Sequence, residues 1–162
     1  MLIEEIKNNS VKGKVLLLFD MDGTCVEYGA GEKQEILDNV EGFYLRKRPL
    51  KSTIKEMKKL SNLSNIEVGI LSNCYYKEQK QDKLAWIDKY LPFLNKDNIF
   101  ILVYTELTFN KEDKNKLKVN FIENNLVNKY QKVYLIEDQH DIIKATNKRY
   151  DNMAHHVSEI LP

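Results

Sequence analysis

The chain of 162 residues is poor in several features that mark particular classes of protein. Its two cysteines, Cys25 and Cys74, are too few for a disulfide framework, so we expect free thiols in a reducing compartment. The 25 Lys and Arg balance the 24 Asp and Glu to a net charge of +1, which excludes a global cationic field for nucleic acids or membranes. The first residues carry Glu4, Glu5 and Lys7 and no long apolar run, unlike a signal peptide or membrane anchor. We therefore expect a cytoplasmic protein.

No repeat or Gly/Pro-rich linker divides the chain, so a single domain over residues 1–162 is expected. Short apolar runs alternate with segments of helical period, which is typical of βα units. The runs predict strands over 15–19, 66–71, 99–104, 133–136 and 153–157. Helical periodicity predicts helices over 33–40, 50–60, 84–91, 117–126 and 141–148. The sequence thus predicts an α/β, Rossmann-like fold whose parallel five-stranded sheet has helices on both faces.

Chemically active side chains follow three of these strands, where open parallel sheets bind their ligands. They are Asp20 and Asp22 after the first strand, Ser72 and Asn73 after the second, and Glu137, Asp138 and Asp141 after the fourth. Carboxylates crowded together repel one another unless a hard divalent cation lies among them. Because no His or Cys cluster has zinc-like spacing, the sequence predicts Mg²⁺ as the cofactor.

Asp20 and Asp22 are expected to face one reaction centre, because alternate residues of an extended segment point to the same side. One carboxylate can then attack while the other moves protons. An aspartate nucleophile suits phosphoryl transfer, because the aspartyl-phosphate that it forms can be hydrolysed in a second step. Gly23 allows the backbone to turn sharply beside a bulky anion.

These residues resemble the motifs of haloacid dehalogenase superfamily phosphatases. Residues 19–24 match the apolar strand followed by Asp-x-Asp-Gly-Thr, residues 70–72 resemble the second motif, and residues 136–138 resemble the acidic fourth motif. The resemblance covers nearly the whole chain in order. More weakly, the chain is similar to deoxyribonucleotidases and to the 3′-phosphatase part of polynucleotide kinase-phosphatases.

The resemblance implies a role for each residue of the motifs. Asp20 attacks, Asp22 protonates the leaving oxygen and later activates water, and Thr24 orients the loop. Asp20, the backbone carbonyl of Asp22, and Asp138 hold Mg²⁺. The phosphoryl oxygens are bound by Ser72 and by backbone groups around Met21, Gly23 and Asn73. Glu137 and Asp141 lie in or near the outer coordination sphere, although Asp141 follows Asp138 by three residues where the family more often has four.

The third motif of the family is a lysine that neutralises the phosphate and the nucleophile. Lys111, Lys114, Lys116 and Lys118 all lie in the expected window. We predict Lys114, from the apolar positions that follow it. Lys118, one helical turn later on the same face, is the alternative.

Between the first two motifs, residues 27–48 form only a short cap-region insertion, which predicts a comparatively open site. The run Arg46-Lys47-Arg48 is read as a solvated face that could form the rim of this site. The predicted function is a Mg²⁺-dependent phosphomonoesterase for a small phosphorylated substrate such as a nucleotide. The alternatives are a nucleic-acid 3′-end phosphatase, which is less favoured, and a catalytically silent phosphate-binding domain. A membrane partner is not expected, and a homo-oligomer is left open.

Overall fold

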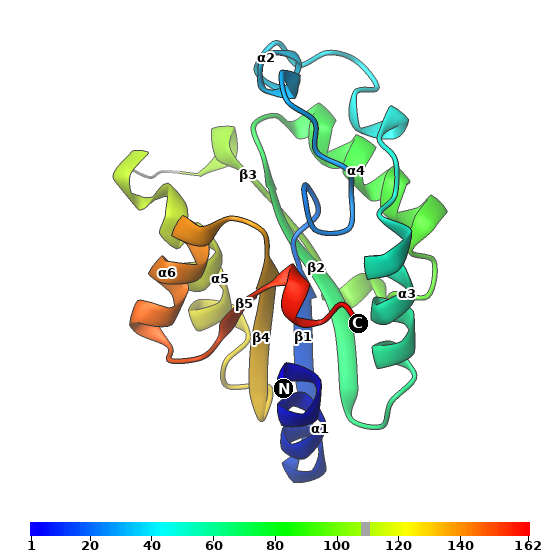
Figure 1. The fold of residues 1–162 in the computed structure, drawn as a ribbon. Coiled ribbons are helices and arrows are strands. Elements are labelled where there is room, and N and C mark those ends of the chain that lie inside the picture. Colours follow the sequence, from blue (N-terminus) through cyan, green and yellow to red (C-terminus); the bar gives the residue numbers. More distant parts are fainter. Residues whose placement is uncertain (108–110) are drawn as a thin grey trace.

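The computed structural model describes residues 1–107 and 111–162, and its centre is a five-stranded, wholly parallel sheet (Figure 1). The strands are β1 (Val15–Phe19), β2 (Ile66–Cys74), β3 (Ile99–Val103), β4 (Lys132–Glu137) and β5 (Ala154–His156). Their order is β3-β2-β1-β4-β5. After β1, the chain adds β2 and β3 on one side of it and then β4 and β5 on the other side. The strand order therefore reverses between β1 and β4.

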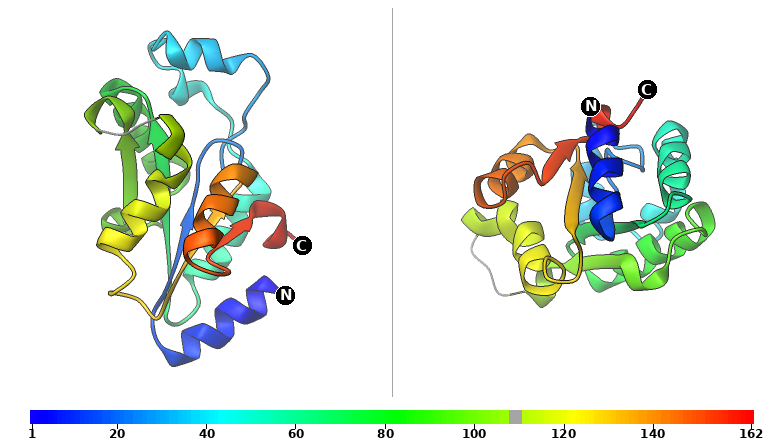
Figure 2. Two further views of the ribbon diagram at one scale, coloured as in Figure 1. Left: turned by 90° about the vertical axis from the view of Figure 1, so that its left-hand side faces the viewer. Right: turned by 90° about the horizontal axis from the view of Figure 1, so that it is seen from below.

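Helices cover both faces of the sheet, as predicted (Figure 2). They are α1 (Leu2–Lys12), α2 (Glu32–Leu37), α3 (Lys51–Ser61), α4 (Lys77–Tyr90), α5 (Leu117–Asn125) and α6 (His140–Arg149). Short 3₁₀ turns include η1 (Tyr44–Arg46), η3 (Tyr104–Glu106) and η4 (Lys111–Lys116). One core contains residues of α1, α3 and α4, and the other contains residues of α5 and α6. The predicted fold class is confirmed.

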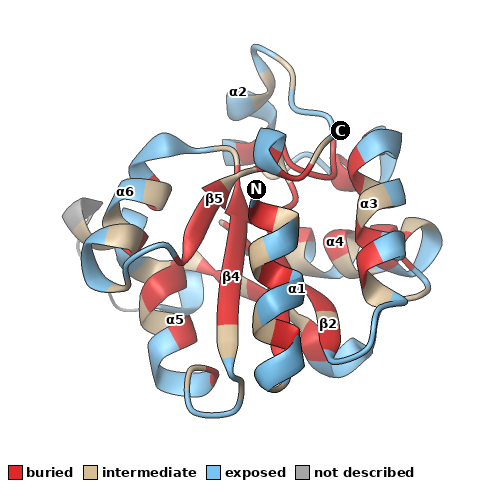
Figure 3. Cartoon of the chain, turned by 60° about the horizontal axis from the view of Figure 1, so that its bottom comes forward, coloured by how far each residue is buried: buried red, intermediate tan, exposed pale blue. Residues whose placement is uncertain are grey.

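The two cores meet at β1, all of whose residues are buried. The neighbouring β4 is also buried along most of its length (Figure 3). Leu16 and Leu18 belong to one core, whereas Val15, Leu17 and Phe19 belong to the other. This division follows from the strand period of two, which sends alternate side chains to opposite faces. A strand covered on both faces must be apolar throughout, so polar side chains can follow only where it ends.

The structure has one helix that the sequence did not predict and one strand that is longer than predicted. Helix α1, which was not predicted, buries Leu2 and Ile6 against the core. Strand β2 continues three residues beyond the predicted end at Leu71 and pairs with β3 through Cys74. Cys25 and Cys74, both among the described residues, are free and buried. Among the described residues, no helix has both the length and the apolar composition needed to cross a membrane.

Candidate active site

Three carboxylates meet where the strand order reverses, at the carboxyl ends of β1 and β4. Phe19 pairs with Ile136 in the sheet, and the Asp20 N–H donates to the Ile136 carbonyl at 2.9 Å. This register brings Asp20 beside Glu137 and Asp138. One oxygen atom from each of these three side chains lies within 4.8 Å of the others. The predicted convergence of Asp20, Glu137 and Asp138 is thus present in the structure.

Lys118 neutralises part of this negative charge. Its Nζ lies 2.7 Å from Asp20 Oδ1 and 2.6 Å from Glu137 Oε2, and its side chain is 3% exposed. Helix α5 begins at Leu117, and its buried face comprises Lys118, Val119 and Ile122. The lysine therefore points toward the sheet.

The preference for Lys114 as the third-motif lysine is corrected by this geometry. Lys114 lies in η4, one turn before Lys118, and its Nζ donates to the hydroxyl of Tyr75 at 2.8 Å. Lys116 is exposed, with its Nζ 3.8 Å from an Asp113 carboxylate oxygen. The side chain of Lys111 lies outside the described residues. Of the described candidates, Lys118 is the lysine that contacts Asp20.

The carboxylate cluster is electrostatically suited to a hard cation. Burial and the nearby Glu137 raise the pKa of Asp20 to about 7, although Lys118 opposes the rise. Burial likewise raises the pKa values of Glu137 and Asp138. A divalent cation among oxygen donors would offset this repulsion.

The hydrogen bonds indicate which oxygens are available to such a cation. Glu137 Oε2 binds Lys118, and its Oε1 accepts the N–H groups of Asp138 and Gln139 at 3.0 and 3.3 Å. Asp138 Oδ1 is buried and has no hydrogen-bond partner among the described residues. Asp20 and Asp138 are therefore the better candidate ligands, and Glu137 orients its neighbours. The donor set fits Mg²⁺.

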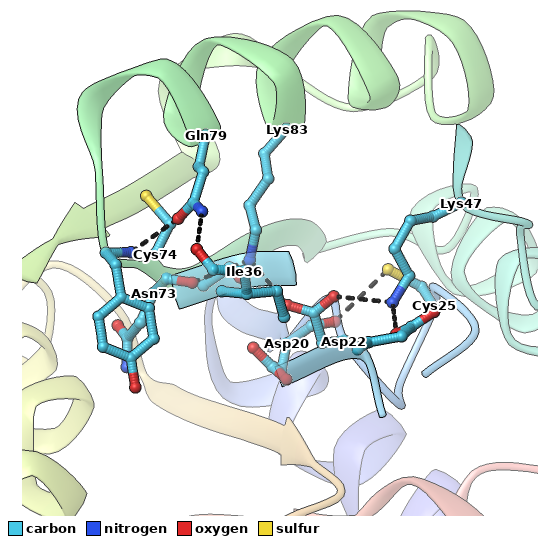
Figure 4. A network of polar contacts seen from close by, with 12 residues as sticks. Asp20, Asp22, Cys25, Ile36, Lys47, Asn73, Cys74, Gln79 and Lys83 are labelled. Atoms are coloured by element: carbon cyan, nitrogen blue, oxygen red, sulfur yellow. Dashed lines mark hydrogen bonds and ion pairs between the residues drawn. The ribbon is translucent and has the colours of Figure 1, made fainter. Parts of the chain in front are cut away.

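Asp22 is not one of the three grouped carboxylates, and it pairs with Lys83 (Figure 4). Lys83 Nζ, on α4, donates to Asp22 Oδ2 at 2.9 Å, to Ser72 Oγ at 2.9 Å and to the Asn73 carbonyl at 2.8 Å. Asp22 Oδ1 is buried without a hydrogen-bond partner among the described residues, and Lys47 Nζ lies 3.7 Å away. One oxygen of Asp22 is thus anchored, while the other is available for proton transfer.

Ser72 and Asn73 reach the site because β2 extends beyond the end of β1. The last residue of β1, Phe19, pairs with Ile70, so Ser72 lies two residues farther along the sheet edge. The Ser72 hydroxyl accepts a hydrogen bond from Lys83. Because an ammonium group only donates, the Ser72 O–H remains able to donate to a phosphoryl oxygen.

Residues 21–24 form a tight turn around the Met21 carbonyl. This carbonyl accepts the N–H groups of Thr24, Cys25 and Val26 at 2.9 to 3.0 Å, and the Met21 and Thr24 side chains are buried. The Gly23 N–H donates to the Val26 carbonyl at 2.8 Å, so this N–H already has a partner within the turn. Gly23 has φ of 79°, and a Cβ there would collide with Asp138 Oδ2. Glycine is needed for this close approach.

The structure also places Asp141 and the basic run of residues 46–48. Asp141 is exposed on the first turn of α6 and is not part of the carboxylate group found among the described residues. In the basic run, Arg46 and Arg48 are exposed, but Lys47 is buried and forms an ion pair with Glu32 at 2.5 Å. Lys47 is therefore an interior residue and not part of a solvated face.

Sequence reasoning did not find Lys83, although a signal was present. Gln79, Lys83, Trp86 and Ile87 are the buried residues of α4, at spacings of four, three and one. These spacings define one helix face. A lysine on the same stripe as a tryptophan and an isoleucine predicts a buried, paired charge. What no sequence pattern revealed was its partner, Asp22.

Residues 27–48 stand above the carboxyl ends of the strands and are attached to α4 (Figure 1). The Glu27 N–H donates to the Arg48 carbonyl at 2.9 Å, which joins the two ends of the segment. Gln79 donates to the Ile36 carbonyl at 2.7 Å, and the Trp86 indole donates to the Lys47 carbonyl at 3.0 Å. Below the segment lies a pocket of about 360 Å³ whose lining includes Asp20, Asp22 and Asp138.

Comparisons with solved structures reveal the fold. The chain resembles a chain of the Pnkp1/Rnl/Hen1 complex (TM-score 0.68, 12% identity, 89% of this chain and 46% of that one). A chain of the Pnkp1/Rnl/Hen1 RNA repair complex is also similar, with a TM-score of 0.70 and 12% identity over 90% of this chain and 42% of that one. A protein named as a haloacid dehalogenase-like hydrolase of Burkholderia xenovorans LB400 matches with a TM-score of 0.53 and 13% identity, over 89% of this chain and 81% of that one.

The chain spans less than half of the two complex-derived chains. No protein-family model matches the sequence, and the comparison with curated proteins finds no match. The parallel sheet, the strand-end carboxylates and the structural matches together agree with the motif resemblance. The chain therefore has a haloacid dehalogenase-like fold.

Proposed function

We propose that the chain is a Mg²⁺-dependent phosphomonoesterase that uses Asp20 as its nucleophile. The observation that carries this proposal is the arrangement around Asp20. Its carboxylate is held by Lys118 at 2.7 Å and is grouped with Asp138. Asp22, two residues later, keeps one oxygen that has no hydrogen-bond partner among the described residues and lies 3.7 Å from Lys47 Nζ. This arrangement supplies a nucleophile, a positive charge and a proton carrier at one sheet edge.

In the first step, a carboxylate oxygen of Asp20 attacks phosphorus and the bond from phosphorus to the leaving oxygen breaks. Asp22 gives its proton to that oxygen, so the leaving group departs as a neutral alcohol. Lys118 and the Ser72 hydroxyl stabilise the negative charge of the phosphoryl group. Lys83 holds Asp22 Oδ2 at 2.9 Å, and this contact fixes the orientation of the other oxygen.

In the second step, water attacks the phosphorus of the aspartyl-phosphate and the bond to Asp20 breaks. Asp22 removes a proton from the water, which restores its protonated form and releases inorganic phosphate. When bound, Mg²⁺ supplies charge neutralisation to the phosphoryl oxygens. Asp20, Asp138 and the backbone carbonyl of Asp22 are the groups proposed to hold it, with Glu137 orienting Asp138 through the N–H···Oε1 bond.

The segment of residues 27–48 is proposed as a reduced cap over a single catalytic domain. Its attachment to α4 leaves the pocket accessible beneath it, and a volume of about 360 Å³ suits a small phosphorylated metabolite such as a nucleotide.

A nucleic-acid 3′-end phosphatase is the second candidate, because two structural matches come from the Pnkp1/Rnl/Hen1 complex, described as an RNA repair complex. Salt separates the candidates. An oligonucleotide that contacts several charges should lose affinity steeply between about 50 and 200 mM salt, whereas a mononucleotide should respond weakly. We expect the shallow response and a preference for the mononucleotide. A steep response with a preferred 3′-phosphorylated oligonucleotide would overturn this choice.

The replacement Asp20→Asn tests the proposal against a catalytically silent domain. It should abolish turnover with Mg²⁺ while the thermal unfolding transition persists, because the shape is kept and the nucleophile is lost. The control Asp151→Asn changes an exposed aspartate and should retain wild-type activity. Activity of Asp20→Asn within about tenfold of wild type, or roughly 1.4 kcal/mol in barrier height, would refute the assignment. Absence of wild-type activity toward every phosphomonoester would favour the silent domain.

A further inference from the structure

The pocket above the carboxylates has aromatic side chains from several separate segments. Tyr28 and Tyr44 come from the segment before α3, Tyr75 follows β2, and Tyr104 follows β3. None of them takes part in the proposed proton transfers. Phosphoryl transfer itself needs charge and hydrogen-bond donors, so the transfer step does not require these aromatic rings.

Tyr75, Tyr104 and Lys114 form one compact group, here named the tyrosine wall. The rings of Tyr75 and Tyr104 meet edge to face with centroids 4.9 Å apart. Lys114 Nζ lies 5.0 and 4.9 Å from these two centroids and donates to the Tyr75 hydroxyl at 2.8 Å. Both tyrosines are half-buried, so each still presents surface to the pocket. The wall is thus held in place by its own contacts.

Tyr28 lies in the cap segment and also lines the pocket. Its side chain is exposed, at 50%, although Lys47 Nζ lies 5.0 Å from its ring centroid. The exposed Lys33 lines the pocket from α2. A ligand bound to the carboxylates would therefore meet aromatic surface both from the cap segment and from the ends of β2 and β3.

We propose that the tyrosine wall is the subsite for a planar ring in the leaving group, and that the substrate is a nucleoside monophosphate. The proposal rests on the proposed phosphatase function and deepens it. Rings bind bases by stacking, which tolerates different bases because each has a π face. A sugar phosphate would instead require several neutral polar side chains for its hydroxyls. Apart from the strand-end residues and the tyrosine hydroxyls, the neutral polar side chains of the pocket lining are those of Asn115 and Gln139.

The first test compares a nucleoside 5′-monophosphate with ribose 5-phosphate, which carries a hydroxyl in place of the base. Wild-type kcat/KM should be higher for the nucleotide by roughly 5- to 150-fold, the range typical of stacking one base on an aromatic side chain. Phosphotyrosine provides a second comparison, since it contains a ring but no base. A higher kcat/KM for phosphotyrosine than for the nucleotide would overturn the choice of nucleoside.

Variants of the wall identify the residues responsible. Tyr75→Leu and Tyr104→Leu should each lower kcat/KM for the nucleotide by about fivefold or more, with ribose 5-phosphate changed by less than about twofold. Activity toward ribose 5-phosphate also shows that the variant is folded. The control Tyr150→Leu removes a half-buried tyrosine from the far end of α6 and should leave the ratio between the substrates unchanged. Equal losses on both substrates would refute the subsite.

Binding to the Asp20→Asn protein separates failure of the subsite from failure of the proposed function. With Mg²⁺ present, calorimetry should show a Kd at least about fivefold lower for the nucleotide than for ribose 5-phosphate, and Tyr75→Leu should remove the difference. Selective binding without any wild-type hydrolysis would overturn the phosphatase and retain the subsite. Hydrolysis with equal kcat/KM and equal Kd for the two compounds would overturn the subsite and retain the phosphatase.

Discussion

Replacement of Lys118 by methionine should affect activity and stability together, because this lysine pairs with two buried carboxylates. Its Nζ lies 2.7 Å from Asp20 Oδ1 and 2.6 Å from Glu137 Oε2, and the three side chains are each less than 8% exposed. Methionine keeps most of the side-chain volume and removes the charge. Asp20 and Glu137 then remain buried beside one another without the cation that separates them.

The magnitude follows from the cost of an unpaired buried charge. Breaking a buried ion pair by removing one partner typically costs about 3–5 kcal/mol of unfolding free energy. The pKa of Asp20 is already raised to about 7 by burial and Glu137, so one carboxyl group can take up a proton in the variant. We therefore expect a loss near the lower limit, about 3 kcal/mol. For catalysis, loss of a preorganised charge at the phosphoryl group should lower kcat by about 100- to 1000-fold.

The assay combines phosphate release with chemical unfolding, and uses two matched lysines as controls. Lys114→Met and Lys116→Met should retain kcat on ribose 5-phosphate within about threefold, because Lys114 contacts Tyr75 and Lys116 is exposed. The double variant Lys118→Met/Glu137→Gln removes one charge of each sign. It should recover much of the lost stability but not the lost kcat, since the activating charge is still absent.

Two results would contradict this reasoning. If Lys114→Met loses more activity than Lys118→Met, the lysine that neutralises the phosphate is the one in η4. If the double variant regains both stability and kcat, Lys118 acts only by compensating Glu137 and has no role at the phosphoryl group.

Three further outcomes are expected. Asp138→Asn should raise the Mg²⁺ concentration for half-maximal activity at least about tenfold, and an unchanged Mg²⁺ titration would place the metal elsewhere. Lys83→Met should lower kcat more than it changes KM, because Lys83 holds Asp22, which acts in the transition state. A change in KM alone, or an equal loss of kcat when an exposed lysine of α4 is replaced, would contradict this. Glu5→Gln should lower the Tm at pH 7. Burial would raise the pKa of Glu5, but hydrogen bonds from Tyr134 and others hold it below its ordinary value of 4.5. This stabilisation is present above pH 4.5 and lost as the pH falls through the folded-state pKa, so the difference in Tm should close in acid.

Much of the fold could be predicted because the signals are local. An all-apolar run such as residues 15–19 must be covered on both faces, and five predicted strands separated by helical periods leave few arrangements. Parallel pairing then brings the strand ends to one edge, so Asp20 and Asp138 were expected at the same edge of the sheet. They meet because β1 and β4 are neighbours, which the sheet order decides. Helix α1 was missed because Leu2 and Ile6 are a weak apolar pattern whose burial depends on the rest of the core.

The partners of the buried charges were decided only by the tertiary structure. Lys114 and Lys118 are one turn apart in sequence, and the start of α5 at Leu117 determines which of them faces Asp20. Lys83 is 61 residues from Asp22, and no local pattern relates them. The sequence by itself determined which chemical groups reach the sheet edge, because the residues that follow each strand are properties of the chain. Helix register and packing determined the partner of each buried lysine. An ion pair depends on distances of a few ångströms, which only the folded chain defines.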